Sequence, residues 1–161
     1  MKFKIGDTLL DNNVFLAPMA GVTDLPFRLL CREQGAGMSV TEMVSAKAIL
    51  YKNKNTKELL AVDRAEGPVS VQLFGSDPEI MAAIAARIED GPYVAIDVNM
   101  GCPVPKIVNN HEGSALMKDP AQAEKVLTAM VKAVKKPVTV KFRKGFNDQN
   151  INAVEFAKMA E

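Results

Sequence analysis

Short apolar runs alternate with helical patterns along the sequence, and this alternation limits the folds open to the chain. Five runs have the length of a β-strand and are rich in Val, Ile or Phe: residues 14–17, 38–41, 69–74, 94–98 and 138–142. The segments between them carry residues that start and stop helices. Strand and helix repeated in this order predict an α/β protein with a parallel sheet.

Capping residues mark the starts of three predicted helices. Thr23 or Asp24 would cap the first, which runs to residue 35. Ser76 and Glu79 have the spacing of a capping box. Asp119 precedes a proline that fits the first position of a helix, and the apolar stripe that follows predicts a helix that ends at residue 137.

Two further expectations concern helices. Residues 46–60 are polar with scattered apolar side chains, and we expect a helix there. In the first helix, Phe27 and Leu30 are expected in the core, and Cys31 is expected to be a small buried thiol without chemistry.

Chain length separates the folds that such a repeat can form. The choices are a doubly wound open sheet and a (β/α)8 TIM barrel, and a whole barrel takes about 250 residues. The 161 residues hold about five units. The last segment, 151–161, has a helical pattern without a cap residue at its end. We therefore expect the first five βα units of a barrel, cut within a larger fold.

Polar residues interrupt three of the predicted strands, although strands of a parallel sheet buried on both faces should be apolar. Because side chains alternate in direction along a strand, the polar ones share one face. They are Gln72, Asp97, Asn99, Lys141 and Arg143. All but Asp97 lie at carboxyl ends of strands, where barrel enzymes hold their active sites. A half-exposed antiparallel sheet is the simpler alternative, and the helices between the strands argue against it.

Composition excludes several classes of function. The net charge is +1, from 20 Lys and Arg against 19 Asp and Glu, which excludes a strongly basic nucleic-acid clamp. The single histidine, His111, excludes a His-rich metal site, and we predict no metal site. Cys31 and Cys102 are too far apart for a CxxC motif, and no signal-peptide pattern is present, which favours the cytoplasm. No run of about 18 apolar residues predicts a membrane span.

A cysteine and a lysine are the residues best placed for chemistry. Gly101 and Pro103 flank Cys102 in a tight loop directly after a strand. An unperturbed thiol is mostly protonated at neutral pH, and no histidine lies beside it in sequence, so we expect a proton donor. A small buried thiol is the alternative. Lys141 on an inward face needs an anionic partner, which a reduced flavin or Asp97 would supply.

Six motifs in one order resemble those of the tRNA-dihydrouridine synthases, most closely the bacterial B-type branch. They are Ala17-Pro18-Met19-Ala20-Gly21-Val22-Thr23-Asp24, Thr41-Glu42-Met43, Gln72-Leu73-Phe74-Gly75, Asn99-Met100-Gly101-Cys102-Pro103, Gly113-Ser114-Ala115-Leu116 and Lys141-Phe142-Arg143. The resemblance runs from about residue 5 to the last residue. It implies a (β/α)8 barrel followed by a small helical domain. It also implies FMN-dependent reduction of the C5=C6 bond of uridine in tRNA, with NADPH as the reductant.

The resemblance divides the site residues into three groups. Those that bind the flavin would be Pro18, Met19, Ala20, Gln72 and Lys141. Those that meet the nucleotide would be Asn99, Lys106 and Arg143. Cys102 would be the catalytic acid, which protonates C5 of uracil as hydride reaches C6. This role agrees with the protonated thiol expected from its sequence context.

The family's later barrel strands, flavin-phosphate loops and helical RNA-binding domain have no counterpart in residues 1–161. We therefore expect residues 1–161 to be the N-terminal portion of an FMN-binding barrel domain. One alternative is a flavin barrel related to dihydroorotate or dihydropyrimidine dehydrogenases. Another is a fragment that is inactive as given and self-associates through its open sheet edges.

Overall fold

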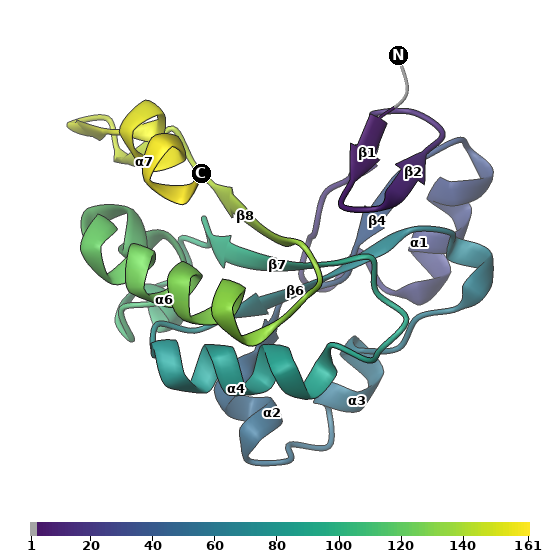
Figure 1. Cartoon of the computed structure of the whole chain (residues 1–161), viewed down its shortest axis with the longest axis horizontal. Coiled ribbons are helices and arrows are strands. Elements are labelled where there is room, and N and C mark those ends of the chain that lie inside the picture. Colours follow the sequence, from purple (N-terminus) through teal and green to yellow (C-terminus); the bar gives the residue numbers. More distant parts are fainter. Residues whose placement is uncertain (1–2) are drawn as a thin grey trace.

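Five parallel strands and a short sixth form one curled sheet in the computed structural model, which describes residues 3–161 (Figure 1). The strand order is β3 (Phe15–Leu16), β4 (Met38–Val40), β6 (Val69–Phe74), β7 (Ala95–Met100) and β8 (Val138–Phe142). A short strand, β5 (Val44–Ser45), pairs with the end of β6. Every pairing in this sheet is parallel, and each predicted apolar run overlaps one of the five strands, although β7 extends beyond the predicted end at residue 98. The predicted α/β fold is confirmed.

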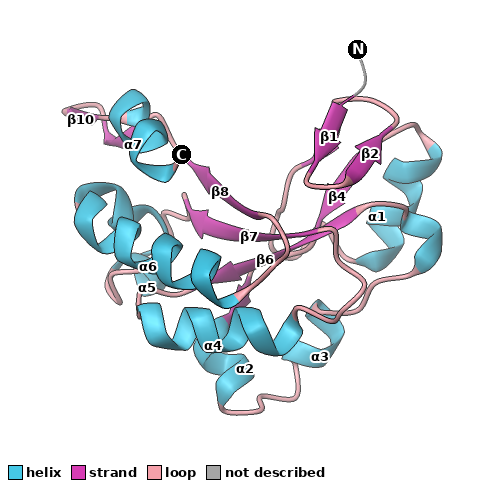
Figure 2. Ribbon diagram, viewed as in Figure 1, coloured by secondary structure: helices cyan, strands magenta, loops and turns pink. Residues whose placement is uncertain are grey.

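Helices cover the convex side of the sheet, and none of the helices within residues 3–161 lies on the concave side (Figures 1 and 2). The α-helices are α1 (Leu25–Glu33), α2 (Ala46–Leu50), α3 (Thr56–Leu59), α4 (Pro78–Ile88), α5 (Pro105–Val108), α6 (Pro120–Ala133) and α7 (Ala153–Ala160). Short 3-10 helices span η1 (Arg64–Glu66) and η2 (Gly113–Lys118). This curled half-barrel is what the first part of a (β/α)8 barrel requires.

Two antiparallel hairpins form small sheets separate from the parallel one, and neither was predicted. The first joins β1 (Phe3–Ile5) to β2 (Thr8–Leu10), and the second joins β9 (Gly145–Asn147) to β10 (Asn150–Ile151). Their strands have two or three residues, which is too short for an alternating pattern to show in the sequence. None of the described helices has the length and apolar character needed to cross a membrane.

Asp77, and not Ser76, caps helix α4. Its Oδ1 accepts hydrogen bonds from the backbone N–H groups of Glu79 (3.0 Å) and Ile80 (3.1 Å). The predicted capping box was wrong by one residue because Pro78 takes the first helical position, where its missing N–H costs nothing. The Ser76 hydroxyl donates instead to the carbonyl oxygen of Asn110.

The other helix predictions have mixed outcomes. Asp24 caps α1, and Asp119 caps α6, as expected. Helix α6 ends at Ala133, short of the predicted stop at residue 137. Residues 46–60 form two short helices instead of one, because the chain turns between them and Lys52 adopts a left-handed φ of 55°.

One apolar cluster fills the space between the sheet and helices α4 and α6. Strands β6 and β7 contribute fully buried apolar side chains to it: Val71, Leu73, Ile96, Val98 and Met100. Helices α4 and α6 supply, among others, Met81, Ile84, Val126 and Met130. Because strand side chains alternate, burial of these residues directs their polar neighbours to the concave side.

The expectation that Phe27 and Leu30 lie in the core is wrong. Their side chains are 37% and 57% exposed. Helix α1 lies at one end of the sheet, beside β4 and η1, and only its inner side meets them. Cys31, expected to be buried, is half-buried on the same helix.

Replacement of Leu73 by alanine tests the core. The side chain is completely buried between the sheet and its helices, so Leu73→Ala should lower the free energy of unfolding by about 2–5 kcal/mol. Val131→Ala is the matched control, because Val131 is exposed on α6, and it should change stability by less than about 0.5 kcal/mol. Urea denaturation measures both, and equal losses would contradict the packing described above.

Candidate functional site

The parallel register of three strands places the polar side chains of the concave face in layers. Gln72 on β6 lies opposite Asp97 on β7, which lies opposite Thr139 on β8. One layer further toward the carboxyl ends, Asn99 lies opposite Lys141. The prediction that these polar residues share a face is confirmed.

A chain of side-chain hydrogen bonds crosses the strands within these layers. The Thr139 hydroxyl donates to Oδ1 of Asp97 (2.6 Å), and Nε2 of Gln72 donates to Oδ2 of the same carboxylate (2.6 Å). Nδ2 of Asn99 then donates to Oε1 of Gln72 (2.9 Å). Burial raises the pKa of the Asp97 carboxyl, and the hydrogen bonds from Thr139 and Gln72 oppose that shift.

The loop that carries Cys102 is fixed from two directions. Oδ1 of Asn99 accepts hydrogen bonds from the backbone N–H groups of Gly101 (3.2 Å) and Cys102 (2.9 Å). On the other side, the Ser114 N–H donates to the Cys102 carbonyl oxygen (3.0 Å). The preceding residue, Gly113, has a φ of +61°, and a Cβ there would lie 2.7 Å from that oxygen. Only glycine therefore allows this approach.

A hollow of about 330 Å³ opens at the carboxyl ends of the strands. All of the predicted site residues except Lys106 line it: Pro18, Met19, Ala20, Gln72, Asn99, Cys102, Lys141 and Arg143. Lys106 is exposed on the short helix α5 and lies outside this lining. The sequence analysis did not select the other lining residues, which are Met43, Gly101, Pro103 and Val104. Met43 could have been found, because the Thr41-Glu42-Met43 motif contains it.

Lys141 is exposed, so the expectation that its side chain is buried is wrong for this chain. The reason is that β8 is an edge strand of the described sheet, and no strand lies beyond it to cover the side chain. Arg143 is also exposed, and its Nε donates to the Gly101 carbonyl oxygen (2.6 Å). Arg143 therefore supports the Cys102 loop as well as lining the hollow.

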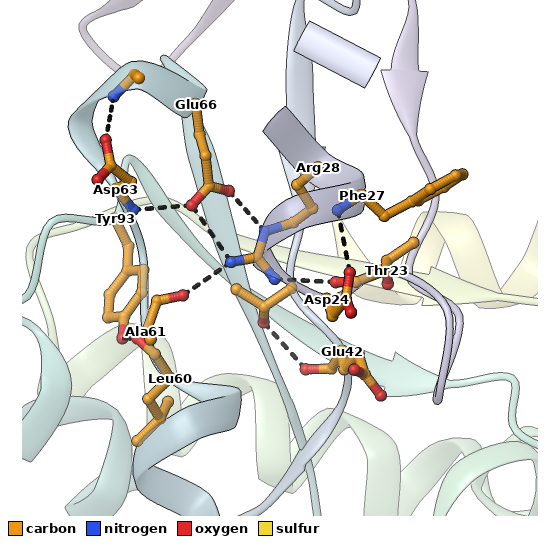
Figure 3. Close-up of polar contacts among 12 residues, drawn as sticks. Thr23, Asp24, Phe27, Arg28, Glu42, Leu60, Ala61, Asp63, Glu66 and Tyr93 are labelled. Carbon is orange, nitrogen blue, oxygen red and sulfur yellow. Dashed lines mark hydrogen bonds and ion pairs between the residues drawn. The ribbon is translucent and has the colours of Figure 1, made fainter. Parts of the chain in front are cut away.

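The loop after β3, which carries Pro18, Met19 and Ala20, forms the wall of the hollow opposite the strands. A buried ion pair supports this loop wall (Figure 3). Nε of Arg28 lies 2.6 Å from Oε2 of Glu66, and both side chains are almost fully buried. The same guanidinium donates to the carbonyl oxygens of Thr23 (2.9 Å) and Ala61 (2.7 Å). The Thr23 hydroxyl oxygen in turn accepts a hydrogen bond from the Met19 N–H (2.9 Å). The loop that follows β3 is thus anchored to the interior.

A second contact fixes the same loop from the neighbouring strand. The N–H of Gly21 donates to Oε2 of Glu42 (2.5 Å), and Glu42 lies in the loop just after β4. Gly21 has a φ of +74°, a conformation that glycine adopts without strain. Pro18, Met19 and Ala20 are therefore held at the hollow by contacts on both sides.

The lining offers particular kinds of chemistry. Among its described residues the ionisable groups are Cys102, Lys141 and Arg143. His111 lies on an exposed turn and lines a separate hollow with Ser76 and Asp119. Within residues 3–161, no group of three or more His, Cys, Asp or Glu side chains is placed to hold a metal ion. The hollow thus combines a thiol, two cations and two amides with an apolar wall.

A curled parallel sheet with a polar hollow at the carboxyl ends of its strands defines the class of βα-barrel proteins. A model of the family "Dihydrouridine synthase (Dus)" matches residues 15–161. The chain is 48% identical to tRNA-dihydrouridine synthase B of Vibrio parahaemolyticus and 47% identical to that of Pseudomonas aeruginosa. It is 45% identical to a probable tRNA-dihydrouridine synthase of Rickettsia bellii. The chain therefore belongs to the dihydrouridine synthase family.

These matches cover almost all of this chain but only part of each relative. Each spans 98% of this chain but only 48% or 49% of the relative. The chain thus spans about half the length of the curated relatives it matches.

Removal of the Glu66 carboxylate tests the anchor of the 18–21 loop. Glu66→Ala leaves the buried Arg28 guanidinium without its partner, so the free energy of unfolding should fall by about 3–5 kcal/mol. Asp11→Asn breaks the exposed Arg32–Asp11 pair and should change it by less than about 1 kcal/mol. A loss for Glu66→Ala as small as that of the control, measured by urea denaturation, would show that the pair is not an anchor.

The pH dependence of stability tests the buried state of Asp97. Its pKa in the folded protein is raised above the usual value of 3.8, so the folded state binds this proton more tightly than the unfolded state. This contribution to stability is fully present below pH 3.8 and is lost as pH rises through the raised pKa. Asp97→Asn removes the titration, so the wild type should lose stability relative to the variant over that rise. A stability difference that does not change with pH would contradict this.

Proposed function

We propose that the protein to which these residues belong is an FMN-dependent tRNA-dihydrouridine synthase. It would reduce the C5=C6 bond of uridine in tRNA with NADPH, in the cytoplasm. The observation that carries the proposal is the hollow, where Cys102, the amides of Gln72 and Asn99, and two cations meet at the carboxyl ends of the strands. The names of the relatives support the same reaction.

The ring of FMN fits the chemistry of this hollow. The hollow has a volume of about 330 Å³, which lies within the range of small-molecule pockets. Pro18, Met19 and Ala20 give it a wall on which a flat ring can pack, while Gln72 and Lys141 offer hydrogen-bond donors to the polar edge of the ring. Bound FMN would supply the hydride. The Lys141 ammonium would stabilise the negative charge that the ring carries in its reduced form, before the hydride leaves.

Cys102 is the group that would protonate C5 of uracil. The described lining contains no carboxylate or imidazole that would act as a base on the thiol. The thiol can therefore serve as the proton donor of this site. The Asn99 and Ser114 hydrogen bonds hold the loop in place, so the distance from the sulfur to the substrate carbon is set before the substrate binds.

Three side chains would bind the nucleotide. Asn99 uses its oxygen and one amide hydrogen within the chain, which leaves one N–H for a uracil oxygen. Arg143 and Lys106 are exposed, Arg143 at the hollow and Lys106 on α5, where cations can meet phosphate groups. A uridine in folded tRNA must leave its stack to reach the thiol.

We assign residues 1–161 to the N-terminal portion of the catalytic barrel. On this assignment, the flavin phosphate and much of the tRNA surface would be bound by sequence that the longer relatives have and residues 1–161 do not. The exposed apolar side chains Phe27 and Leu30 agree with a barrel helix that packs against further elements.

Replacement of Cys102 in the full-length protein tests the reaction. Cys102→Ala should retain FMN, seen as a flavin absorbance band after desalting, because the thiol is not a flavin ligand in this proposal. Dihydrouridine formation in unmodified tRNA should fall by about 10²–10⁴-fold, the usual contribution of a general acid. Cys31→Ala is the matched control and should leave both measurements unchanged, because Cys31 lies on α1 outside the lining of the hollow.

Undiminished dihydrouridine formation by the Cys102→Ala enzyme would refute the assigned role. Turnover of free dihydroorotate or dihydrouracil in place of tRNA would instead favour the dehydrogenase alternative.

A further inference from the structure

We propose that Asp97 is a positioning residue of this site. Its buried carboxylate sets the orientation of the Gln72 and Asn99 amides, and through them the position of the loop that holds Cys102. The importance of that loop for catalysis rests on the proposed function, whereas the orientation itself can be tested without cofactor or tRNA.

The first step is the acceptor character of the carboxylate. An ionised carboxylate can only accept hydrogen bonds, so the Gln72 amide must present its nitrogen to Asp97 and not its oxygen. The observed contact has this polarity, with Nε2 of Gln72 lying 2.6 Å from Oδ2 of Asp97. The Gln72 oxygen is consequently turned toward Asn99.

The second step is the donor character of the backbone at the other end. The N–H groups of Gly101 and Cys102 can only donate, so Asn99 must present its oxygen to them. Its nitrogen then faces the Gln72 oxygen at 2.9 Å. Two neutral amides thus lie between a group that only accepts and groups that only donate. One orientation of each amide satisfies the whole chain, and a flip of either puts like groups together.

The third step is burial, which makes the orientation strict. The Gln72 side chain is 0% exposed and Asp97 is 6% exposed, so bulk water has little access to repair a mismatch. A buried donor or acceptor left without a partner costs about 1–3 kcal/mol. Thr139, which also contacts the carboxylate, does not set the polarity, because a hydroxyl can donate or accept.

The orientation has a consequence for the ligand. Both amide oxygens are used within the chain, and each amide keeps one N–H that is not. Both residues line the hollow, but Gln72 is fully buried, and the Asn99 oxygen already accepts two hydrogen bonds, so the group that Asn99 has left for a ligand is an N–H. This side of the site therefore suits carbonyl oxygens of a ligand, and Asp97 determines that preference although Asp97 itself does not line the hollow.

Three variants of nearly constant shape separate polarity from packing. Asp97→Leu fills a similar volume but gives Gln72 no acceptor. Asp97→Asn keeps an oxygen toward Gln72, because its nitrogen can donate to the Thr139 hydroxyl. Thr139→Val removes the second contact of the carboxylate and leaves the first. Each is made in a Cys31→Ala background, so that Cys102 is the one thiol present.

The readouts are hydrogen exchange of the Cys102 backbone amide and the rate of Cys102 alkylation by iodoacetamide. Asp97→Leu should speed the exchange by about tenfold or more, which corresponds to the loss of one hydrogen bond, and should change the alkylation rate. Asp97→Asn and Thr139→Val should stay within about twofold of the parent, as is expected for retained bonds. Wild-type exchange and alkylation in a folded Asp97→Leu protein would overturn the proposal, since packing alone would then hold the loop.

A measurement on the unmodified chain decides the question even if Asp97→Leu does not fold. Scalar couplings across hydrogen bonds should link the Cys102 amide nitrogen to the side-chain carbonyl carbon of Asn99, and Nε2 of Gln72 to the carboxylate carbon of Asp97. Their absence, when the backbone bonds between β6 and β7 do give such couplings, would overturn the proposed orientation. Neither measurement needs FMN or tRNA, so an active Cys102→Ala enzyme, or turnover of free dihydroorotate in place of tRNA, would refute part of the proposed function and leave this result standing.

Discussion

Strands β6, β7 and β8 form one wall of the hollow, the β-sheet wall. Their parallel register determines where the polar side chains of this wall lie. Gln72, Asp97 and Thr139 meet because their strands are paired at those residues. A slip of one residue would turn Asp97 into the apolar cluster and expose Val98 on the concave face. Burial of the core side chains therefore selects the register, and the register then assembles the hydrogen bonds of the site. Burial of the same core side chains thus determines both the stability of the sheet and the geometry of the site.

The opposite wall depends on a different interaction. The 18–21 loop belongs to no regular element, and the buried Arg28–Glu66 pair holds it through Thr23. Burying two charges is costly unless their remaining donors and acceptors are satisfied. Arg28 meets this condition with two carbonyl oxygens, and Glu66 also accepts from the Asp63 N–H. Loss of this pair would release the 18–21 loop, while strands β6, β7 and β8 would keep their register.

Local patterns in the sequence predicted the parts of the structure that local physics decides. The apolar runs predicted the strands, and the period of two along β7 and β8 predicted the polar face that lines the hollow. Asp24 was a sound helix cap because capping involves residues only three apart. The Asp63 and Glu66 spacing is also a capping box, and it could have drawn attention to Glu66.

Features that depend on distant partners could not be predicted in the same way. Arg28 and Glu66 are 38 residues apart, and no periodic pattern connects them. The exposure of Lys141 follows from the position of β8 at the sheet edge, which is a property of the whole strand order. Phe27 is exposed because only the inner side of α1 meets neighbouring elements, and this too depends on the whole fold. An apolar helix face in the sequence shows that a surface needs a partner, but not which element supplies it.

The polar groups of the site change from a hydrogen-bond acceptor to donors toward the carboxyl ends of the strands. The buried layer ends in an acceptor, the Asp97 carboxylate, and the groups above it are donors: the free N–H of Asn99, the Lys141 ammonium and the Arg143 guanidinium. One buried negative charge thus orients the amides so that they add to the cations of the rim instead of opposing them. Carbonyl oxygens and phosphates are acceptors, so this single ordering of charge suits the flavin, uracil and tRNA proposed above as ligands.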